Sequence, residues 1–475
     1  MSELRIETRT GETTTLTRAE VEALAARLRG TLILKDNHDY DAARSIWNGM
    51  IDKRPAAIAR CANPADVAAT VRFARERDLC VSVRSVGHNI AGSALCDGGL
   101  VIDLSHMKGI RVDRRRGRAW AQPGADWGDL DTEAQAIGRI VPGGIVSTTG
   151  IAGLTLGGGF GWLTRKYGFT CDSLLSADVV TADGERRTAS LEENPDLFWG
   201  LRGAGGNFGV VTSFEYALQP LGPEVVCGLR VYPMAEADRI LRGFRELTRQ
   251  ASDDLSLLAV LRYAPPLPVL PPEVHGQPIV AIVACHAGSV AEGERTMRPL
   301  RELGEPLADT IGPKPFAAHQ SMFDAANPSG RHYYWKSEYL GGLQDGLIDV
   351  LGEFGGRLSS PHSAVLLMHL GGQARRVPAD ATSATNRDAE YILNIASSWI
   401  EPGESERHVA FTREFWRAVR PFGSGGTYVN FLTADDDEAR VRAAFGPSYD
   451  RLAALKGRYD PDEFFRPHQS VRPLK

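Results

Sequence analysis

Apolar positions near the start of the chain recur with two different spacings. Residues 58–84 contain two short apolar runs separated by a stretch with helical periodicity, which predicts strand, helix and strand. Asn63 can cap this helix and Pro64 can begin it, because the proline ring suits the first helical turn. Residues 99–104 predict another strand, and 17–29 another helix. The first part of the chain therefore mixes short strands with helices.

The pattern changes after about residue 222. Long amphipathic helices are predicted over 234–250 and 290–304. They alternate with apolar strands, predicted over 255–263, 278–287 and 363–372. Helices packed on one face of a mainly antiparallel sheet would bury these apolar faces. The whole chain is therefore expected to be an α+β protein.

Glycine is unusually frequent and clustered. The chain has 50 glycines, and six of them fall within TGIAGLTLGGGFG at 149–161. Each glycine costs roughly 0.5–1 kcal/mol in regular structure through chain entropy. Such a cluster indicates tight turns, close packing or a ligand pressed against the main chain. Exposed backbone amides favour a flat or anionic ligand.

A second glycine cluster, GAGGNFG at 203–209, is reminiscent of a dinucleotide fingerprint. That fingerprint follows a strand and opens a helix. Here the glycines follow a predicted helix and open a predicted strand, so a Rossmann site is not expected. The chain has no GxxxxGK[ST] motif either, which argues against P-loop phosphoryl transfer.

Composition and charge narrow the function classes. A chain of 475 residues is expected to form at least two domains. The net charge of −5 argues against nucleic acid or an anionic membrane as the main partner. No apolar run reaches the roughly 20 residues of a membrane span, and no signal-peptide pattern is present. Six scattered cysteines indicate reduced thiols in a cytoplasmic protein, and no spacing indicates a metal site.

The loop RSVGHNIAG at 84–92 contains a histidine between two predicted strands. Arg84, Ser85, Gly87 and Asn89 could present guanidinium, hydroxyl and amide donors to a pyrophosphate. A histidine in a loop more often packs against its neighbours or faces solvent than takes part in chemistry. On residue type alone, His88 is therefore a weak candidate for function.

Four ordered segments carry a resemblance to a known family: 58–113, 143–168, 194–216 and the C-terminal segment TYVNFL followed by 449–473. They resemble the PCMH-type FAD-binding domain and the C-terminal motif of the vanillyl-alcohol oxidase superfamily. The match is closest to its berberine-bridge-enzyme-like branch. It covers about 40–222 and 400–475 strongly, and the residues between them weakly.

The resemblance implies both the fold and its division. It implies an α+β protein with a two-subdomain, PCMH-type FAD-binding domain and an α/β substrate domain, in which helices cover an antiparallel sheet. Residues 1–222 would form the FAD-binding domain, with its core at about 53–222. Residues 223–430 would form the substrate domain, and 431–475 would return to the FAD-binding domain.

The resemblance also implies covalent FAD, bound through a ring nitrogen of His88 to the 8α-methyl carbon. Val146 stands where members with two covalent links bear cysteine, so a single tether is expected. Ser85 and Val86 replace loop glycines, and His468 replaces an asparagine before Gln469. The other positions expected to contact FAD are Arg84, Ser85, Val86, Gly87, Asn89, Ser147, Thr149, Gly150, Gly153, Gly159, Val211, Asn430 and Gln469.

For catalysis, the family needs a base within reach of a substrate hydroxyl or amine. Tyr428, on a late predicted strand, is the candidate base; a buried tyrosine of that strand is the alternative interpretation. Val429 and Phe431 occupy neighbouring positions where relatives place aromatic residues. His369, at the end of a predicted strand, is a second candidate. Asn430 is expected to bond the flavin or to support the strand.

The implied function is an oxidase that passes a hydride from a small organic molecule to FAD and then electrons to dioxygen, giving hydrogen peroxide. The substrate could be an alcohol, an amine, a phenolic compound or a sugar, because fold does not choose among them. A dehydrogenase or tailoring enzyme with another acceptor is one alternative. A flavin-binding partner without turnover is another. A monomer or a homodimer is expected.

Overall fold

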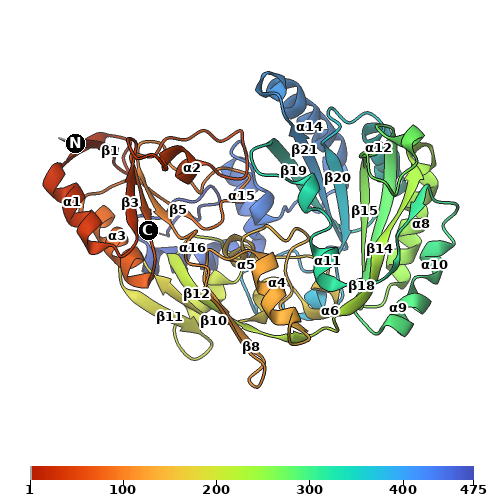
Figure 1. Ribbon diagram of the computed structural model, residues 1–475, viewed down its shortest axis with the longest axis horizontal. Coiled ribbons are helices and arrows are strands. Elements are labelled where there is room, and N and C mark those ends of the chain that lie inside the picture. Colours follow the sequence, from red (N-terminus) through yellow and green to blue (C-terminus); the bar gives the residue numbers. More distant parts are fainter. Residues whose placement is uncertain (1–2, 475) are drawn as a thin grey trace.

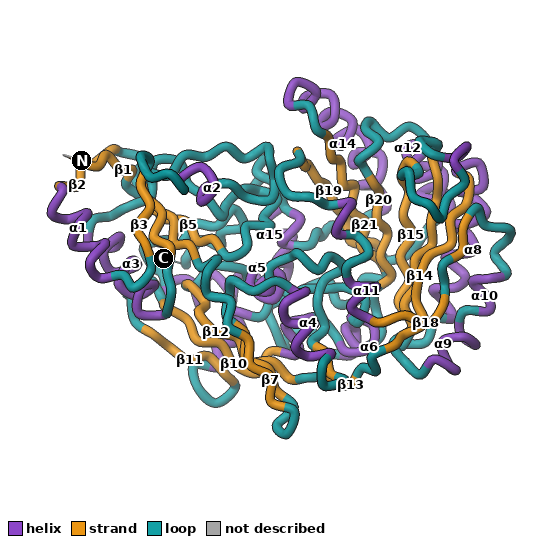
Figure 2. The backbone as a smooth tube through the Cα atoms, in the orientation of Figure 1, coloured by secondary structure: helices purple, strands orange, loops and turns teal. Residues whose placement is uncertain are grey.

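Five β-sheets organise residues 3–474, the part of the chain that the computed structural model describes (Figures 1 and 2). Two of the sheets have only two strands: β1 (Glu3–Glu7) with β2 (Thr13–Thr17), and β9 (Arg139–Ile140) with β13 (Gln219–Pro220). Mixed helices and sheets confirm the expected α+β class. No helix of the described residues has the length and apolar character to cross a membrane.

A four-stranded sheet forms the N-terminal part, in the order β3 (Thr31–Leu34), β4 (Ala57–Arg60), β6 (Leu100–Asp103), β5 (Val81–Arg84). β4 and β5 run parallel to β6. The helix α3 (Pro64–Glu76) connects β4 to β5, and the side chain of Asn63 accepts hydrogen bonds from its first turn. The expected cap and first helical residue are therefore confirmed.

The second large sheet is antiparallel, in the order β11 (Arg186–Ser190), β10 (Leu174–Val180), β12 (Val210–Ala217), β8 (Arg118–Ala121), β7 (Ile110–Asp113). The glycines of the second cluster lie between α7 (Pro195–Leu201) and β12. This is the order expected from sequence, and it differs from that of a Rossmann fingerprint.

An eight-stranded antiparallel sheet forms the other half, seen at the right of Figure 1. Its order is β17 (Ala308–Asp309), β14 (Glu224–Pro233), β16 (Pro278–His286), β15 (Leu255–Tyr263), β20 (Ala364–His369), β21 (Tyr391–Trp399), β19 (His332–Leu340), with β18 (Gly312–Pro315) also paired to β14. Alternate residues of β15 face opposite sides. Leu257, Ala259 and Leu261 pack under helices, while Leu258 and Val260 belong to the other core.

The helices α8 (Ala237–Gln250), α12 (Asp345–Gly355) and α14 (Ser405–Val419) cover the outer face of this sheet (Figure 1). This arrangement was expected from the amphipathic pattern. The prediction of a single helix over 290–304 is wrong in one respect. It divides into α9 (Val290–Thr296) and α10 (Arg298–Arg301), because Pro299 begins a new helical turn and has no N–H to continue the old one.

The end of the chain lies against the first half. In α16 (Tyr449–Tyr459), the buried ammonium of Lys456 donates to the carbonyls of Asn207 and Phe465, at 2.7 and 2.8 Å, and pairs with Asp460 at 2.6 Å. The remaining helices are α1 (Arg18–Arg27), α2 (Tyr40–Arg44), α4 (Trp127–Gln135), α5 (Ile151–Leu156), α6 (Thr164–Tyr167), α11 (Phe316–Gln320), α13 (Gln373–Arg376) and α15 (Glu438–Phe445).

Candidate active site

A cavity of about 330 Å³ lies between the two halves. One side, here called the loop wall, consists of lining residues from 81–94, 144–160 and 205–211. The opposite side, the sheet wall, consists of lining residues from β15, β19, β20 and β21. Among the described residues that line the cavity, none is an aspartate or a glutamate. The site therefore offers no carboxylate to a ligand.

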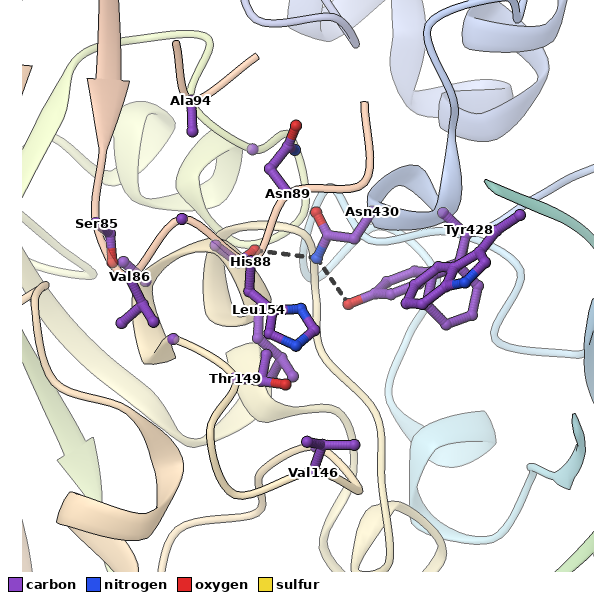
Figure 3. Close-up of a pocket in the computed structure, with 18 of the residues that line it drawn as sticks. Ser85, Val86, His88, Asn89, Ala94, Val146, Thr149, Leu154, Tyr428 and Asn430 are labelled. Atoms are coloured by element: carbon purple, nitrogen blue, oxygen red, sulfur yellow. Dashed lines mark hydrogen bonds between the residues drawn. The ribbon is translucent and has the colours of Figure 1, made fainter. Parts of the chain in front are cut away.

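The loop after β5 presents its backbone to this cavity. Ser85, Val86, Gly87, His88 and Asn89 all line it (Figure 3). Gly87 has a φ angle of +88°, which residues other than glycine rarely adopt. No backbone carbonyl of the described residues accepts from the N–H groups of 85–89. A run of such N–H groups is a typical anion-binding feature.

His88 is held in a stack of aromatic rings. Its imidazole lies 4.1 Å from the ring of Trp47, which in turn stacks on Tyr333 at 3.7 Å. The His88 Nε2 atom is buried without a hydrogen-bond partner among the described residues. Burial lowers the pKa of His88 to about 4, so the ring is neutral near pH 7. A neutral imidazole has a free lone pair, as a nucleophile requires.

Two expected donors are used inside the protein. The Arg84 guanidinium donates to the carbonyl of Ala43 and does not line the cavity, and the Ser85 hydroxyl donates to the carbonyl of Pro123. The Ser85 hydroxyl and one Arg84 nitrogen are thus already engaged, and contact of these two side chains with a pyrophosphate stays a prediction. The backbone N–H groups of 85–89, by contrast, have no carbonyl partner among the described residues and are available to bind a pyrophosphate. Residue type alone does not reveal this backbone conformation.

The glycine-rich segment continues the loop wall. Thr149, Gly150 and Gly153 line the cavity at the start of α5, and Val146 lies beside them (Figure 3). A Cβ atom added at Gly153 would have no atom within 4 Å, so this position opens onto free space. The same holds for Gly206, which sequence reasoning did not single out. Val211 and Gln469, both expected, also line the cavity.

Tyr428 and Asn430 close one end of the cavity. The Tyr428 hydroxyl accepts hydrogen bonds from Gly159 N at 3.2 Å and from Asn430 Nδ2 at 2.9 Å (Figure 3). Asn430 Nδ2 also donates to the Gly153 carbonyl at 3.0 Å. Burial raises the pKa of Tyr428 well above its usual value, and both donors act in the opposite direction. The expected strand is wrong here, since 429–431 form a short 3-10 turn.

Besides Arg84, three further expected site residues do not line the main cavity. Gly159 contributes only its N–H to Tyr428. The Ser147 hydroxyl and N–H both donate to Asp324. His369 Nε2 lies 3.0 Å from Arg165, and because arginine only donates, Nε2 is the acceptor. His369 thus points away from any substrate position in the cavity.

The sheet wall contains polar residues that sequence reasoning missed. Arg262, Asn394 and Trp335 line the cavity from β15, β21 and β19. A signal was present, because Arg262 and Asn394 each interrupt an otherwise apolar strand pattern. Their proximity, however, depends on the pairing of strands that lie far apart in sequence.

Comparisons with known proteins match both the first part and the end of the chain. The family model for an FAD binding domain matches residues 55–190, and that for berberine and berberine-like proteins matches 427–472. (R)-6-hydroxynicotine oxidase of Paenarthrobacter nicotinovorans is 32% identical over 464 residues, covering 94% of this chain and 97% of its own. A FAD-linked oxidoreductase of Bacillus subtilis, YgaK, is 29% identical and covers 94% and 98%.

Solved structures extend the match to the fold. The crystal structure of 6-hydroxy-D-nicotine oxidase from Arthrobacter nicotinovorans superposes with a TM-score of 0.83 at 30% identity, covering 94% of this chain and 98% of that one. The BBE-like 1 protein of Physcomitrella patens gives a TM-score of 0.85 at 20% identity, covering 96% and 99%. The expected PCMH-type fold is thereby confirmed.

Proposed function

The chain belongs to the berberine-bridge-enzyme-like family of FAD-linked oxidoreductases, and on that premise we propose that it is an oxidase with singly tethered FAD. It would oxidise a small organic molecule and reduce dioxygen to hydrogen peroxide. A secondary alcohol would lose two electrons and two protons to become a ketone, and one dioxygen would take up both to become one hydrogen peroxide. The observation that carries the proposal is the cavity that joins the 85–89 loop, His88 Nε2 and Tyr428.

The residues present fit FAD. The backbone N–H groups of 85–89 would bind the pyrophosphate. The open positions at Gly153 and Gly206 leave room for a flat ring close to the main chain. Bound FAD would supply the hydride-accepting and oxygen-reducing chemistry, as cofactors do in such enzymes. We also propose that the chain divides into an FAD-binding domain at 1–222, a substrate domain at 223–430 and a segment at 431–475 that returns to the FAD-binding domain.

His88 would hold the cofactor through a bond from a ring nitrogen to the 8α-methyl carbon. This bond replaces one imidazole N–H bond and one methyl C–H bond. The two electrons and two protons released go to dioxygen as hydrogen peroxide. The neutral ring and the unpartnered Nε2 atom support this role. Trp47 positions the imidazole by stacking on it. Val146 offers no thiol for a second link.

Tyr428 is the proposed acid–base residue. Its hydroxyl lines the cavity and already accepts two N–H hydrogen bonds. These donors stabilise negative charge on the phenol oxygen and offset part of the rise in pKa that burial causes. Tyr428 would accept the proton of the substrate hydroxyl or amine as its phenolate. Asn430 holds this oxygen in place, because its amide nitrogen bonds both Tyr428 and the Gly153 carbonyl. His369 is not carried into this proposal.

A substrate screen tests the proposal. The purified full chain is mixed in air with alcohols, amines, phenolic compounds and sugars, while oxygen uptake and peroxide are recorded. An oxidase gives one peroxide for each dioxygen consumed. Flavin reduction without oxygen uptake, with electrons passed only to an added dye, would assign a dehydrogenase instead. Protein purified without any flavin would overturn the proposal.

A further inference from the structure

Four cross-strand neighbours form one row on the sheet wall. Arg262 of β15 pairs with Ala364 of β20, Ala364 pairs with Ala396 of β21, and Ala396 pairs with Trp335 of β19. All four residues line the cavity. Adjacent strands lie about 4.8 Å apart, so Arg262 and Trp335 are separated by roughly 14 Å. The two alanines between them leave a flat, shallow floor.

Positive charge collects at the Arg262 end of this row. Arg262 donates from Nε to the Tyr263 carbonyl at 3.2 Å, and no hydrogen bond of its terminal nitrogens is found among residues 3–474. Burial lowers the pKa of Arg262, and the nearby Arg331 lowers it further. His362 also lines the cavity, and burial, followed by Arg331 and Arg262, lowers its pKa, so its ring is neutral near pH 7. No carboxylate of the described lining residues compensates this charge.

The neighbouring row adds a polar group that has no partner. Val260, Leu366 and Asn394 are paired across the same three strands. Asn394 is 4% exposed, and its Oδ1 atom is buried without a hydrogen bond to any described residue. Trp335 Nε1 is likewise buried and unpartnered. Buried polar groups normally have partners, so these two atoms indicate a polar ligand at this wall.

Apart from Ser398 and Tyr333, the remaining lining of the sheet wall is apolar. Leu258, Met368 and Ile392 form the next row, and Phe431 closes it from the C-terminal segment. A sugar exposes many hydroxyl groups and would leave them without partners against such a surface. An ammonium group would meet the cationic Arg262 and no carboxylate among the described lining residues. A flat apolar body therefore fits the row, with its charged group at Arg262.

We propose that the substrate is an aromatic or similarly flat apolar molecule that bears a carboxylate, and that Arg262 binds this carboxylate. The inference rests on the proposed function, because it names the substrate class of the same site. Arg262 would pair with the two oxygens of the carboxylate, as the planar guanidinium favours. Asn394 and Trp335 would bond polar groups elsewhere on the ring.

The test measures binding and needs no turnover. Isothermal titration calorimetry on the FAD-loaded full chain compares 2-naphthoate, 2-naphthamide and 2-naphthylmethylammonium, which share one ring system. The carboxylate should bind at least about tenfold more tightly than the amide, because a hydrogen-bonded charge pair is lost in the amide. The ammonium should bind most weakly. Equal binding of carboxylate and amide, or tightest binding of the ammonium, would overturn the proposal.

Variants locate the preference. Arg262→Gln should remove the tenfold preference and leave amide binding unchanged, whereas Arg18→Gln, at an exposed arginine paired with Glu22, should keep it. If Arg262→Gln does not fold, Ala364→Asp places a carboxylate beside Arg262 in the same row and should also abolish the preference. A preference that survives a folded variant would contradict the assignment. 2-Naphthoate and 2-naphthamide have no CH–OH or CH–NH group to oxidise, so their comparison measures binding alone. Absence of oxidase activity in the substrate screen would contradict the proposed function and leave this binding result unchanged.

Discussion

The two walls of the cavity present different chemical groups. The loop wall presents backbone: N–H groups of 85–89 and glycines that leave open space, such as Gly153. The sheet wall presents side chains, arranged in rows across four strands. Backbone recognition needs particular conformations and few particular side chains. Side-chain recognition can change with each substitution, so we propose that the loop wall binds the cofactor and the sheet wall selects the substrate.

The largest expected effect is the loss of covalently bound flavin when His88 of the loop wall is replaced. His88→Ala should abolish acid-stable flavin, since the described lining residues of the loop wall include no other histidine and no cysteine. The measurement is flavin absorbance and chain mass after acid precipitation. His106→Ala, at an exposed histidine, should retain the full amount. Flavin that stays bound to the denatured His88→Ala chain would place the tether elsewhere.

Acid sensitivity is the next largest effect, and it involves a histidine behind the sheet wall. Burial, and then Arg165, lowers the pKa of His369 to about 3. Above pH 6.5 the imidazole is neutral in both folded and unfolded chains. As pH falls below 6.5, only the unfolded chain gains the proton, so the folded state loses about 3 kcal/mol by pH 4.

Urea unfolding at pH 7 and pH 4 measures this loss. His369→Gln, which can still accept from Arg165, should lose less stability on acidification than the unaltered chain. His38→Gln, at a fully exposed histidine, should behave like the unaltered chain. Equal acid losses in all three proteins would show that His369 gains a proton in the folded state as readily as in the unfolded one.

Tyr428 lines the cavity, and its replacement tests the proposed acid–base role. Tyr428→Phe should lower the rate of flavin reduction by substrate at least about tenfold, toward the 10²-fold lower end for a lost acid–base group. Anaerobic stopped-flow with a substrate from the screen gives this rate. Tyr459→Phe removes a hydroxyl bonded to Asp196, outside the cavity, and should leave the rate unchanged. A normal rate in Tyr428→Phe would remove it from the mechanism.

The smallest effect tests the backbone character of the loop wall. Gly153→Leu puts a side chain into the open space beside the ring site and should reduce flavin bound per chain by about tenfold, the equivalent of 1–3 kcal/mol of overpacking. Gly352→Leu makes the same change at a helical glycine of α12 that is equally open, and should bind flavin normally. Full flavin content in Gly153→Leu would show that the ring does not approach this position.

Local signals were read correctly where the interaction is local. The Asn63 cap, three strands of the eight-stranded sheet (β15, β16 and β20) and the loop around His88 follow from neighbouring residues. The hydrogen-bond partners of the expected donors could not be predicted in the same way. Arg84 and Ser85 bond the carbonyls of Ala43 and Pro123, which no spacing near the loop reveals.

The sequence by itself determined the α+β class, the ordered motifs of the FAD domain and the candidacy of His88, because each depends on residues within a short segment. Tertiary structure alone decided that His369 turns to Arg165, that Trp47 stacks on His88, and that Arg262 faces Trp335 across two alanines. Strand pairing brings residues more than a hundred positions apart into one row. Substrate choice therefore depends on register, which the order of residues does not display.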